Sequence, residues 1–369
     1  MNTRLKTLAL ALFGFASISR AQGPVTLHIG DKAPEMKYSK WLKGTPVKEY
    51  QKDRLYVLEF WATWCGPCKA AMPHLSELAK KYEKEATVIG VNVWEKTGEK
   101  PYESSLPEVS RFVTSIGDKM SYNVIADNND QHMGEKWMKA AGQYGIPCTF
   151  VVKNDQILWI GHPMKLDSTM QLVLSGKYDM AGVRADFDRK QKASEAQTAE
   201  IRKAFDPVNE AIKAKDYALA VRMIDSGIIK APTYAPALNN MKFTTLLDHV
   251  SADSAIAFAK VWIKQASWAA SSVGMSISQK DGLSKEAYLF AAGLLKDAAA
   301  SPGIVTPLVY HSLAGTYAKA GDYKAAVEAQ EKALADAKVA LKEGKWLGTI
   351  LDYTVTDYEK ELAGYKKKL

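Results

Sequence analysis

A pair of cysteines, Cys65 and Cys68, separated by a Gly-Pro dipeptide, constrains this chain more than any other motif. Residues 55–60 (LYVLEF) precede the pair and form a short apolar run typical of a strand, whereas residues 69–84 have the spacing of an amphipathic helix. In a tight turn between a strand and a helix, two such cysteines can open and close one disulfide with little backbone movement. The pattern therefore predicts redox chemistry at the start of the helix.

Residues 61–69 (WATWCGPCK) resemble the active site of the thioredoxin superfamily, including the tryptophans and the Gly-Pro pair. Residues 30–34 (GDKAP) resemble the start of its extracytoplasmic TlpA-like and redoxin (AhpC/TSA-like) branches. The resemblance implies an α/β thioredoxin-like fold over residues 24–180, with a central mixed sheet flanked by helices. Strands are expected at 56–60, 87–93, 149–152 and 156–160, and helices at 69–84, 107–116, 131–141 and 168–175.

The two cysteines are expected to have different roles. Cys65 should cap the helix, where free backbone N–H groups and the helix dipole stabilise a thiolate and lower the thiol pKa. Cys68 lies about one turn later on the same face. We therefore expect Cys65, with its sulfur facing solvent, to attack a substrate disulfide and Cys68 to resolve the mixed disulfide. A purely structural disulfide or half a zinc site is disfavoured, because the sequence has no second CxxC and no spaced His pair. Apart from this disulfide, no cofactor and no metal are expected.

Glu59 is a charged residue inside an apolar strand, six positions before Cys65. A buried carboxylate is costly unless it has a partner or a task. Because the superfamily often carries an acid under the resolving cysteine, the resemblance implies that Glu59 shuttles the proton of Cys68. The alternative is an edge-strand glutamate that faces water, which the poor alternation of its neighbours disfavours.

A second segment is expected beside the cysteines. Pro147 precedes the predicted strand 149–152, as the cis-proline of the superfamily precedes a strand that packs against CxxC. The resemblance implies a cis Ile146–Pro147 bond and an Ile146 backbone that pairs with an extended substrate peptide. Trp64 is expected to supply an apolar docking surface next to the disulfide. The expected substrate-binding residues are Trp64, Gly66, Pro67, Ile146 and Pro147.

Cys148 departs from the family pattern, which more often has Thr or another small residue after the cis-proline. One interpretation is a small buried hydrophobe, since free cysteines are so often simply buried. The other is a third redox thiol near Cys65, able to form an alternative disulfide or to complete a three-thiolate metal site. We favour the first.

The composition changes after residue 180. Residues 181–205 are charged and Ala-rich, which predicts a helical connector, and residues 206–369 are rich in Ala, Leu and Lys. Residues 216–221 (DYALAV) and 322–327 (DYKAAV) share the pattern D-Y-x-x-A-V at an offset of 106 residues, close to three periods of about 34–35 residues. The last copy, preceded by LAGTY at 313–317, resembles a tetratricopeptide repeat. We therefore expect an all-α domain of helical hairpins, with an irregular bundle as the alternative.

Residues 1–21 resemble a secretory signal, with a positive start, an apolar run at 8–18 and small residues before Gln22. Export to a bacterial periplasm with cleavage near Ala21 is expected, and a retained N-terminal anchor is the alternative. Three cysteines are too few for a disulfide-stapled scaffold. The formal charge of +8 is spread along the chain, so nucleic-acid binding has no support.

The expected activity is that of an exported thiol–disulfide oxidoreductase, because the Gly-Pro dipeptide resembles the reducing members of the superfamily. Its expected partners are protein disulfides, a membrane or soluble electron-donor protein, and a protein bound by the helical domain. A thiol peroxidase is one alternative, suggested by GDKAP and by Thr63 near Cys65. However, Ala62 stands where peroxiredoxins carry Thr, and the proline seven positions before the cysteine is missing. The other alternative is a helical scaffold whose redox domain serves only its bound client.

Overall fold

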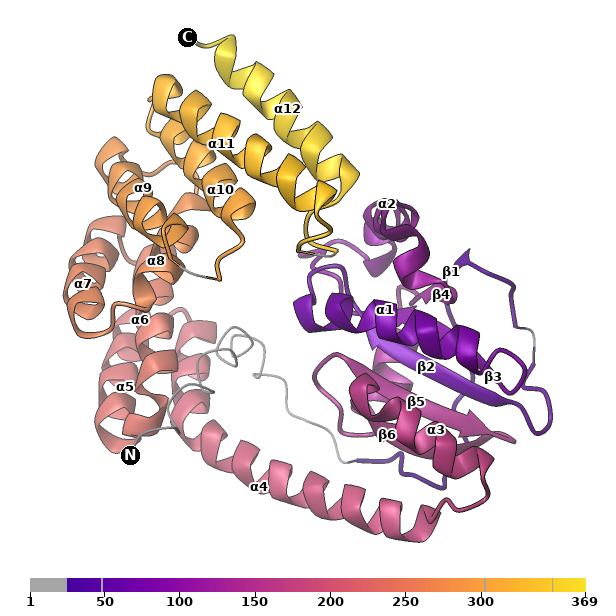
Figure 1. Cartoon of the computed structure of the whole chain (residues 1–369). Helices are drawn as coiled ribbons and strands as arrows, with labels where there is room; N and C mark the ends of the chain where they lie inside the picture. The colour runs from indigo at the N-terminus through magenta and orange to yellow at the C-terminus, as the bar shows by residue number, and fades with distance from the viewer. Residues whose placement is uncertain (1–24, 48, 302, 347) are drawn as a thin grey trace, which may run out of the picture. The chain divides into compact units, whose positions relative to one another are not determined.

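The structure, a computed structural model, describes residues 25–47, 49–301, 303–346 and 348–369. The described residues form two compact units, whose helices and strands are labelled in Figure 1. Each unit has apolar clusters of its own. The first unit contains the described residues up to Glu195, together with 346 and 348–351. The second contains the described residues of 196–345 and 352–369. The predicted leader, residues 1–21, lies outside the described residues.

The first unit is built on a six-stranded mixed sheet in the order β1-β4-β3-β2-β5-β6. Three neighbouring strands are parallel: β2 (Leu55–Trp61), β3 (Ala86–Asn92) and β4 (Asn123–Ala126). The other three run antiparallel to their neighbours: β1 (Lys40–Lys43), β5 (Cys148–Lys153) and β6 (Gln156–Gly161). Every residue of β2 is buried, which explains why all but Glu59 are apolar, because a central strand is covered on both faces.

Helices cover one face of this sheet. They are α1 (Gly66–Lys81), α2 (Leu106–Ile116) and α3 (Leu166–Leu174). The ring of Trp61 lies 5.3 Å from that of Phe112 in α2, and Lys81 of α1 donates a hydrogen bond of 2.7 Å to Asp167 of α3. Alternate residues of β2 point to the opposite face, where they pack in an apolar cluster with Trp137 and Phe150.

Most predicted elements of this unit are present with small shifts at their ends, and the α/β fold with a mixed sheet is confirmed. β1 and β4 were missing from the prediction, since four residues are too short to establish a pattern. The helix predicted at 131–141 is instead a π-helix, Gly134–Lys139. The Asp127 carboxylate accepts the N–H groups of Met133 and Gly134 at 2.9 Å, and so fixes the start of this turn.

The remaining elements are helical. α4 (Met180–Lys213) is one continuous helix that includes the predicted connector, and the division between the two units falls inside it. The helices that follow are α5 (Tyr217–Lys230), α6 (Ala235–His249), α7 (Ala252–Gln265), α8 (Ala269–Ser278), α9 (Lys285–Ala299), α10 (Thr306–Lys319), α11 (Tyr323–Lys342) and α12 (Asp352–Lys366). Most successive helices pack against each other, as in helical hairpins. Among the described residues, no helix has both the length and the apolar character needed to cross a bilayer.

The repeated D-Y-x-x-A-V pattern marks the start of a helix. Asp216 accepts the N–H of Leu219 and caps α5, and Asp322 accepts the N–H of Ala325 and caps α11. The alanine of each copy is fully buried, which lets the neighbouring helix approach closely. The pattern therefore encodes a capped helix with a small buried residue one turn later. The helical region is confirmed, whereas tetratricopeptide stacking stays a prediction.

Candidate active site

Cys65 and Cys68 form a disulfide at the N-terminus of α1. Cys65 is the N-cap residue, and its sulfur accepts a hydrogen bond of 3.2 Å from the backbone N–H of Cys68. Pro67 lies in the first turn, where its missing N–H leaves no intrahelical bond unmade. The Cys65 sulfur thus lies at the positive end of the helix, where a thiolate would be stabilised.

The Cys65 sulfur is less accessible than the sequence predicts. Only 3% of Cys65 and 1% of Cys68 are exposed, so the expectation of a solvent-facing sulfur is wrong for this disulfide form. A distant part of the chain contributes a contact here, since the backbone oxygen of Ile146 is 3.8 Å from Cys65 Sγ. Gly66 and Pro67 remain exposed at the tip of the helix.

The predicted substrate-binding segment lies beside the disulfide. The Ile146–Pro147 peptide bond is cis, and the segment leads directly into β5, which pairs with β2. Cys65 and Ile146, 81 residues apart in sequence, are thereby brought together. The Ile146 backbone thus lies next to Cys65, and its pairing with a substrate peptide stays a prediction.

Trp64 is the exposed aromatic residue of the site, with 45% of its surface accessible. Its indole N–H donates to the backbone oxygen of Trp94 at 2.8 Å. The ammonium group of Lys96 lies 5.4 Å from the centre of its ring, within the range of a cation–π contact. Trp64 is thus an exposed side chain fixed by two contacts, and its role as a docking surface stays a prediction.

Glu59 is buried beneath the disulfide end of the sheet, with 1% of its surface exposed. It pairs in register with Gly90 of β3 and Thr149 of β5, on the face of β2 that α1 and α2 cover. The Thr149 hydroxyl donates to Oε2, whereas Oε1 has no hydrogen-bond partner among the described residues. Burial raises the pKa of Glu59 well above its usual value, and the smaller opposing effect is the Thr149 bond. Such a carboxyl group can take up and release a proton closer to neutral pH than an exposed one.

Cys148 lies on the other face of the sheet. It pairs with Phe60 in register and packs in the apolar cluster with Phe150 and Trp137. Burial, the larger effect, and the nearby Glu59 both raise the pKa of its thiol, so at neutral pH it carries its proton. This environment agrees with the interpretation of Cys148 as a small buried hydrophobe.

The sequence reasoning missed a polar network that holds the segment before Cys65. Thr63 donates its backbone N–H to Glu95 Oε1 at 2.7 Å and its hydroxyl to Glu95 Oε2 at 2.6 Å. The Asn92 side-chain amide donates to the same Oε1 at 2.7 Å, and Tyr102 donates to the backbone oxygen of Asn92 at 2.7 Å. Asn92 was the available signal, because a polar residue at the carboxyl end of an apolar parallel strand lies where α/β folds place their sites.

Lys69 follows Cys68 directly and is nearly buried. Burial lowers the pKa of its ammonium group, and the attraction of Glu95 opposes that shift. Gly348, which belongs to the first unit, passes close to this side chain with a φ of +67°. A Cβ at Gly348 would lie 2.8 Å from Lys69 Cδ, so both the approach and the dihedral angle require glycine.

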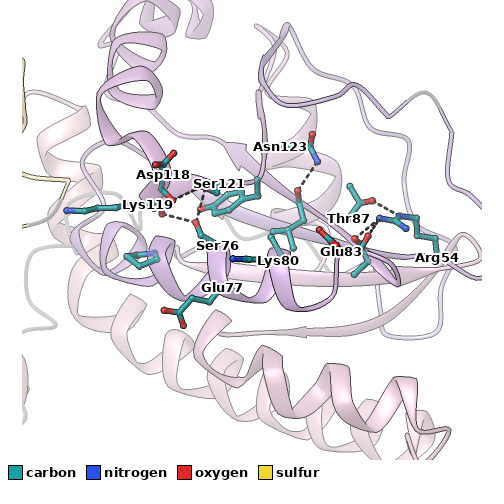
Figure 2. A pocket seen from close by; sticks show the side chains of 15 residues that line it. Arg54, Ser76, Glu77, Lys80, Glu83, Thr87, Asp118, Lys119, Ser121 and Asn123 are labelled. Atoms are coloured by element: carbon teal, nitrogen blue, oxygen red, sulfur yellow. Dashed lines mark hydrogen bonds between the residues drawn. The ribbon is translucent and has the colours of Figure 1, made fainter.

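A cavity of about 720 Å³ lies along the flank of α1, away from the disulfide (Figure 2). Its lining includes charged residues of both signs, among them Lys80, Glu83 and Asp118. Figure 2 shows Ser76 bonded to the Lys119 backbone, so part of this polar surface is already paired within the protein. Within the described ranges, no group of three or more His, Cys, Asp or Glu side chains is arranged to hold a metal ion.

Several known proteins are similar to part of this chain. Residues 29–159 match the AhpC/TSA family. Protein FixW of Rhizobium leguminosarum is 27% identical over 205 residues, which cover 55% of this chain and 91% of that protein. The thiol-disulfide oxidoreductase ResA of Geobacillus thermodenitrificans is 28% identical over 162 residues (42% of this chain, 83% of ResA). Thioredoxin 2 of Chlorobaculum tepidum is 33% identical over 89 residues (22% of this chain, 82% of that thioredoxin). A solved thioredoxin domain of a thiol-disulfide oxidoreductase from Bacteroides vulgatus is 20% identical, covers 39% of this chain and 96% of its own, and has a TM-score of 0.30.

Proposed function

The chain belongs to the AhpC/TSA family within the thioredoxin superfamily and is a thiol–disulfide oxidoreductase, and we propose that it reduces disulfides of other proteins outside the cytoplasm. One observation carries the proposal. Cys65 caps α1 with its sulfur bonded to the Cys68 N–H, next to the Ile146 backbone and in the same unit as the buried carboxyl of Glu59. This arrangement supports the proposed roles of Cys65 as nucleophile, Cys68 as resolving thiol and Glu59 as proton acceptor, with a peptide bound along Ile146.

The proposed reaction starts from the reduced dithiol. The Cys65 thiolate attacks one sulfur of the substrate disulfide, so a mixed disulfide forms and one substrate thiolate leaves. Cys68 then gives its proton to Glu59 and attacks Cys65 Sγ. The Cys65–Cys68 disulfide forms, the second substrate thiolate leaves, and two electrons have passed to the substrate. A separate electron-donor protein returns the pair to the dithiol.

Export and reducing direction are parts of the proposal that rest on sequence. Residues 1–21 resemble a secretory signal, and the Gly-Pro dipeptide resembles that of reducing relatives. We further propose that the helical unit binds a protein partner and so selects the substrates of the redox unit. The packing of successive helices supports this proposal, since stacked helical repeats form extended surfaces that bind proteins.

Reduction of insulin by dithiothreitol, followed as turbidity, tests the activity. The wild-type protein should accelerate the reaction, and Cys65→Ser should remove the acceleration. Cys148→Ser is the matched control, since it removes a buried sulfur outside the proposed cycle and should keep the activity. Consumption of hydrogen peroxide with the same reductant, unaccompanied by insulin reduction, would instead favour a thiol peroxidase.

A further inference from the structure

The loop that follows β3 contacts the segment immediately before the redox pair. Glu95 binds Thr63 through both of its carboxylate oxygens, at 2.7 Å to the backbone N–H and 2.6 Å to the hydroxyl. Thr63 is two residues before Cys65, and the Cys65 backbone N–H in turn donates to the oxygen of Ala62 at 3.1 Å. Glu95 therefore holds the turn from which Cys65 projects.

We propose that Glu95 is a positioning residue for Cys65. Glu95 orients the turn that carries the nucleophile, and the charge of Glu95 sets how readily the Cys65–Cys68 disulfide is reduced. The inference rests on the proposed function and adds a residue to its machinery. Hydrogen bonds to an ionised carboxylate are about twice as strong as neutral ones, so a two-point attachment restrains both the backbone and the side chain of Thr63.

Two buried residues hold Glu95 in place for its hydrogen bonds to Thr63. Asn92 is fully buried at the end of β3 and donates to Glu95 Oε1 at 2.7 Å. Tyr102, also buried, begins the short 3-10 helix Tyr102–Ser105 and donates to Asn92. Because each member is held by the next, Glu95 has little freedom to leave Thr63.

The charge of Glu95 has a second consequence. A carboxylate this close to the turn disfavours a thiolate at Cys65 and therefore disfavours the dithiol form. Lys69 on α1 and Lys96 on the same loop act in the opposite sense, and Glu59 acts from β2 in the same sense when it is ionised. Replacing Glu95 by the neutral, isosteric glutamine should therefore shift the equilibrium with glutathione towards the dithiol.

Three variants of the full-length protein separate position from charge. Glu95→Gln removes the charge and weakens the bonds to Thr63. Thr63→Val removes the hydroxyl bond and keeps both the backbone bond and the charge. Glu99→Gln is the matched control, since Glu99 is exposed on the same loop and loses the same charge. For each variant, the equilibrium constant between the Cys65–Cys68 pair and glutathione is measured together with kcat/KM for insulin and the melting temperature.

For Glu95→Gln, we expect the glutathione equilibrium to move about two- to fivefold towards the dithiol and kcat/KM to fall about three- to tenfold. Thr63→Val should lower kcat/KM with less than a twofold change in the equilibrium, and Glu99→Gln should change neither. If Glu95→Gln and Glu99→Gln give the same equilibrium constant, or if Glu95→Gln changes only the melting temperature, the inference is wrong. The glutathione equilibrium needs no protein substrate, so it tests Glu95 even if the wild-type protein fails to reduce insulin.

Discussion

The carboxyl group of Glu59 lies in the interior of the first unit with one oxygen bonded to Thr149 and the other unpaired among the described atoms. Such a group costs stability when it is ionised, because burial removes its hydration. We propose that a task in the redox cycle explains its place inside the strand that leads to the redox pair. The proposed task is to receive the proton of Cys68 at the moment when Cys68 attacks the mixed disulfide.

Replacing Glu59 by glutamine should therefore slow the resolving step. Glutamine keeps the size and the Thr149 contact but accepts no proton, so we expect the rate of release from a preformed mixed disulfide to fall about 10- to 100-fold. Stopped-flow fluorescence of the nearby tryptophans can follow this release. An unchanged rate in Glu59→Gln, with Glu99→Gln as the control, would assign the proton to another acceptor.

The raised pKa of Glu59 also predicts a pH-dependent stability. The folded state holds a proton that the unfolded chain releases above the ordinary pKa of about 4.5, so the contribution of Glu59 falls as the pH rises from there through its folded pKa. Glu59→Leu has no carboxyl group and so does not lose stability in this way. The free energy of unfolding of Glu59→Leu, relative to that of the wild type, should therefore increase by about 1–3 kcal/mol from pH 5 to pH 8. Urea denaturation of the disulfide form at both pH values measures this difference, and a difference independent of pH would contradict the prediction.

Local patterns in the sequence predict some of these residues and miss others. Cys65 and Cys68 are contiguous with their strand and helix, so their position at a helix N-terminus could be predicted from a single window. The contact between Glu95 and Thr63 joins residues 32 apart, and nothing in either window points to the other. The predicted solvent exposure of the Cys65 sulfur was wrong, and the contact with Ile146, 81 residues away, could not be predicted from the local sequence either.

At the scale of single elements, β3 lies between β2 and β4, and Gly90 of β3 lies where the side chains of Trp61 and Tyr122 pack against the strand. A Cβ at Gly90 would lie 3.0 Å from Tyr122 Cε2 and 3.1 Å from Trp61 Nε1, both in large buried side chains. Gly90→Ala should therefore lower the free energy of unfolding by about 1–3 kcal/mol. Gly293→Ala is the control, because no atom lies within 4 Å of the added Cβ inside α9, and it should gain up to about 1 kcal/mol. Chemical denaturation of both variants measures the difference, and equal stabilities would show that the space at Gly90 adapts.

The predictability of elements follows their length and their capping. β2 could be predicted because six of its seven residues are apolar or aromatic, with Glu59 the exception. The starts of α5 and α11 could be predicted because Asp216 and Asp322 cap them within their own sequence. The π-helix could not, since its start is fixed by the carboxylate of Asp127, which lies outside the helical pattern.

At the scale of the whole molecule, the chain has two units with separate apolar clusters, and the disulfide belongs to the first. Calorimetry should accordingly resolve two unfolding transitions. Reduction removes a cross-link that closes a very short loop and contributes about 2 kcal/mol to the free energy of unfolding. The melting temperature of the first unit should therefore fall by about 4–8 °C, and that of the second unit should stay unchanged. The variant with both cysteines replaced by serine should be insensitive to reductant. A single transition, or movement of both, would contradict the independence of the units.

The division into units was only partly predictable. The change of composition near residue 180 correctly separates a mixed α/β region from a helical one, because strand-type runs end there. The boundary between the two units lies inside α4, and residues 346 and 348–351 belong to the first unit although they follow most of the second in sequence. No composition signal marks such a short segment, in which Gly348 lies close to Lys69 of α1.

The proposal that Cys65 attacks protein disulfides and Cys68 resolves the product is tested most directly by trapping. Cys68→Ser, reduced and mixed with a disulfide-containing protein, should remain joined to it, and intact-mass and peptide analysis should place the new bond at Cys65. Cys65→Ser, treated in the same way, should form no stable adduct. An adduct at Cys148, or equal capture by both variants, would contradict the assigned roles.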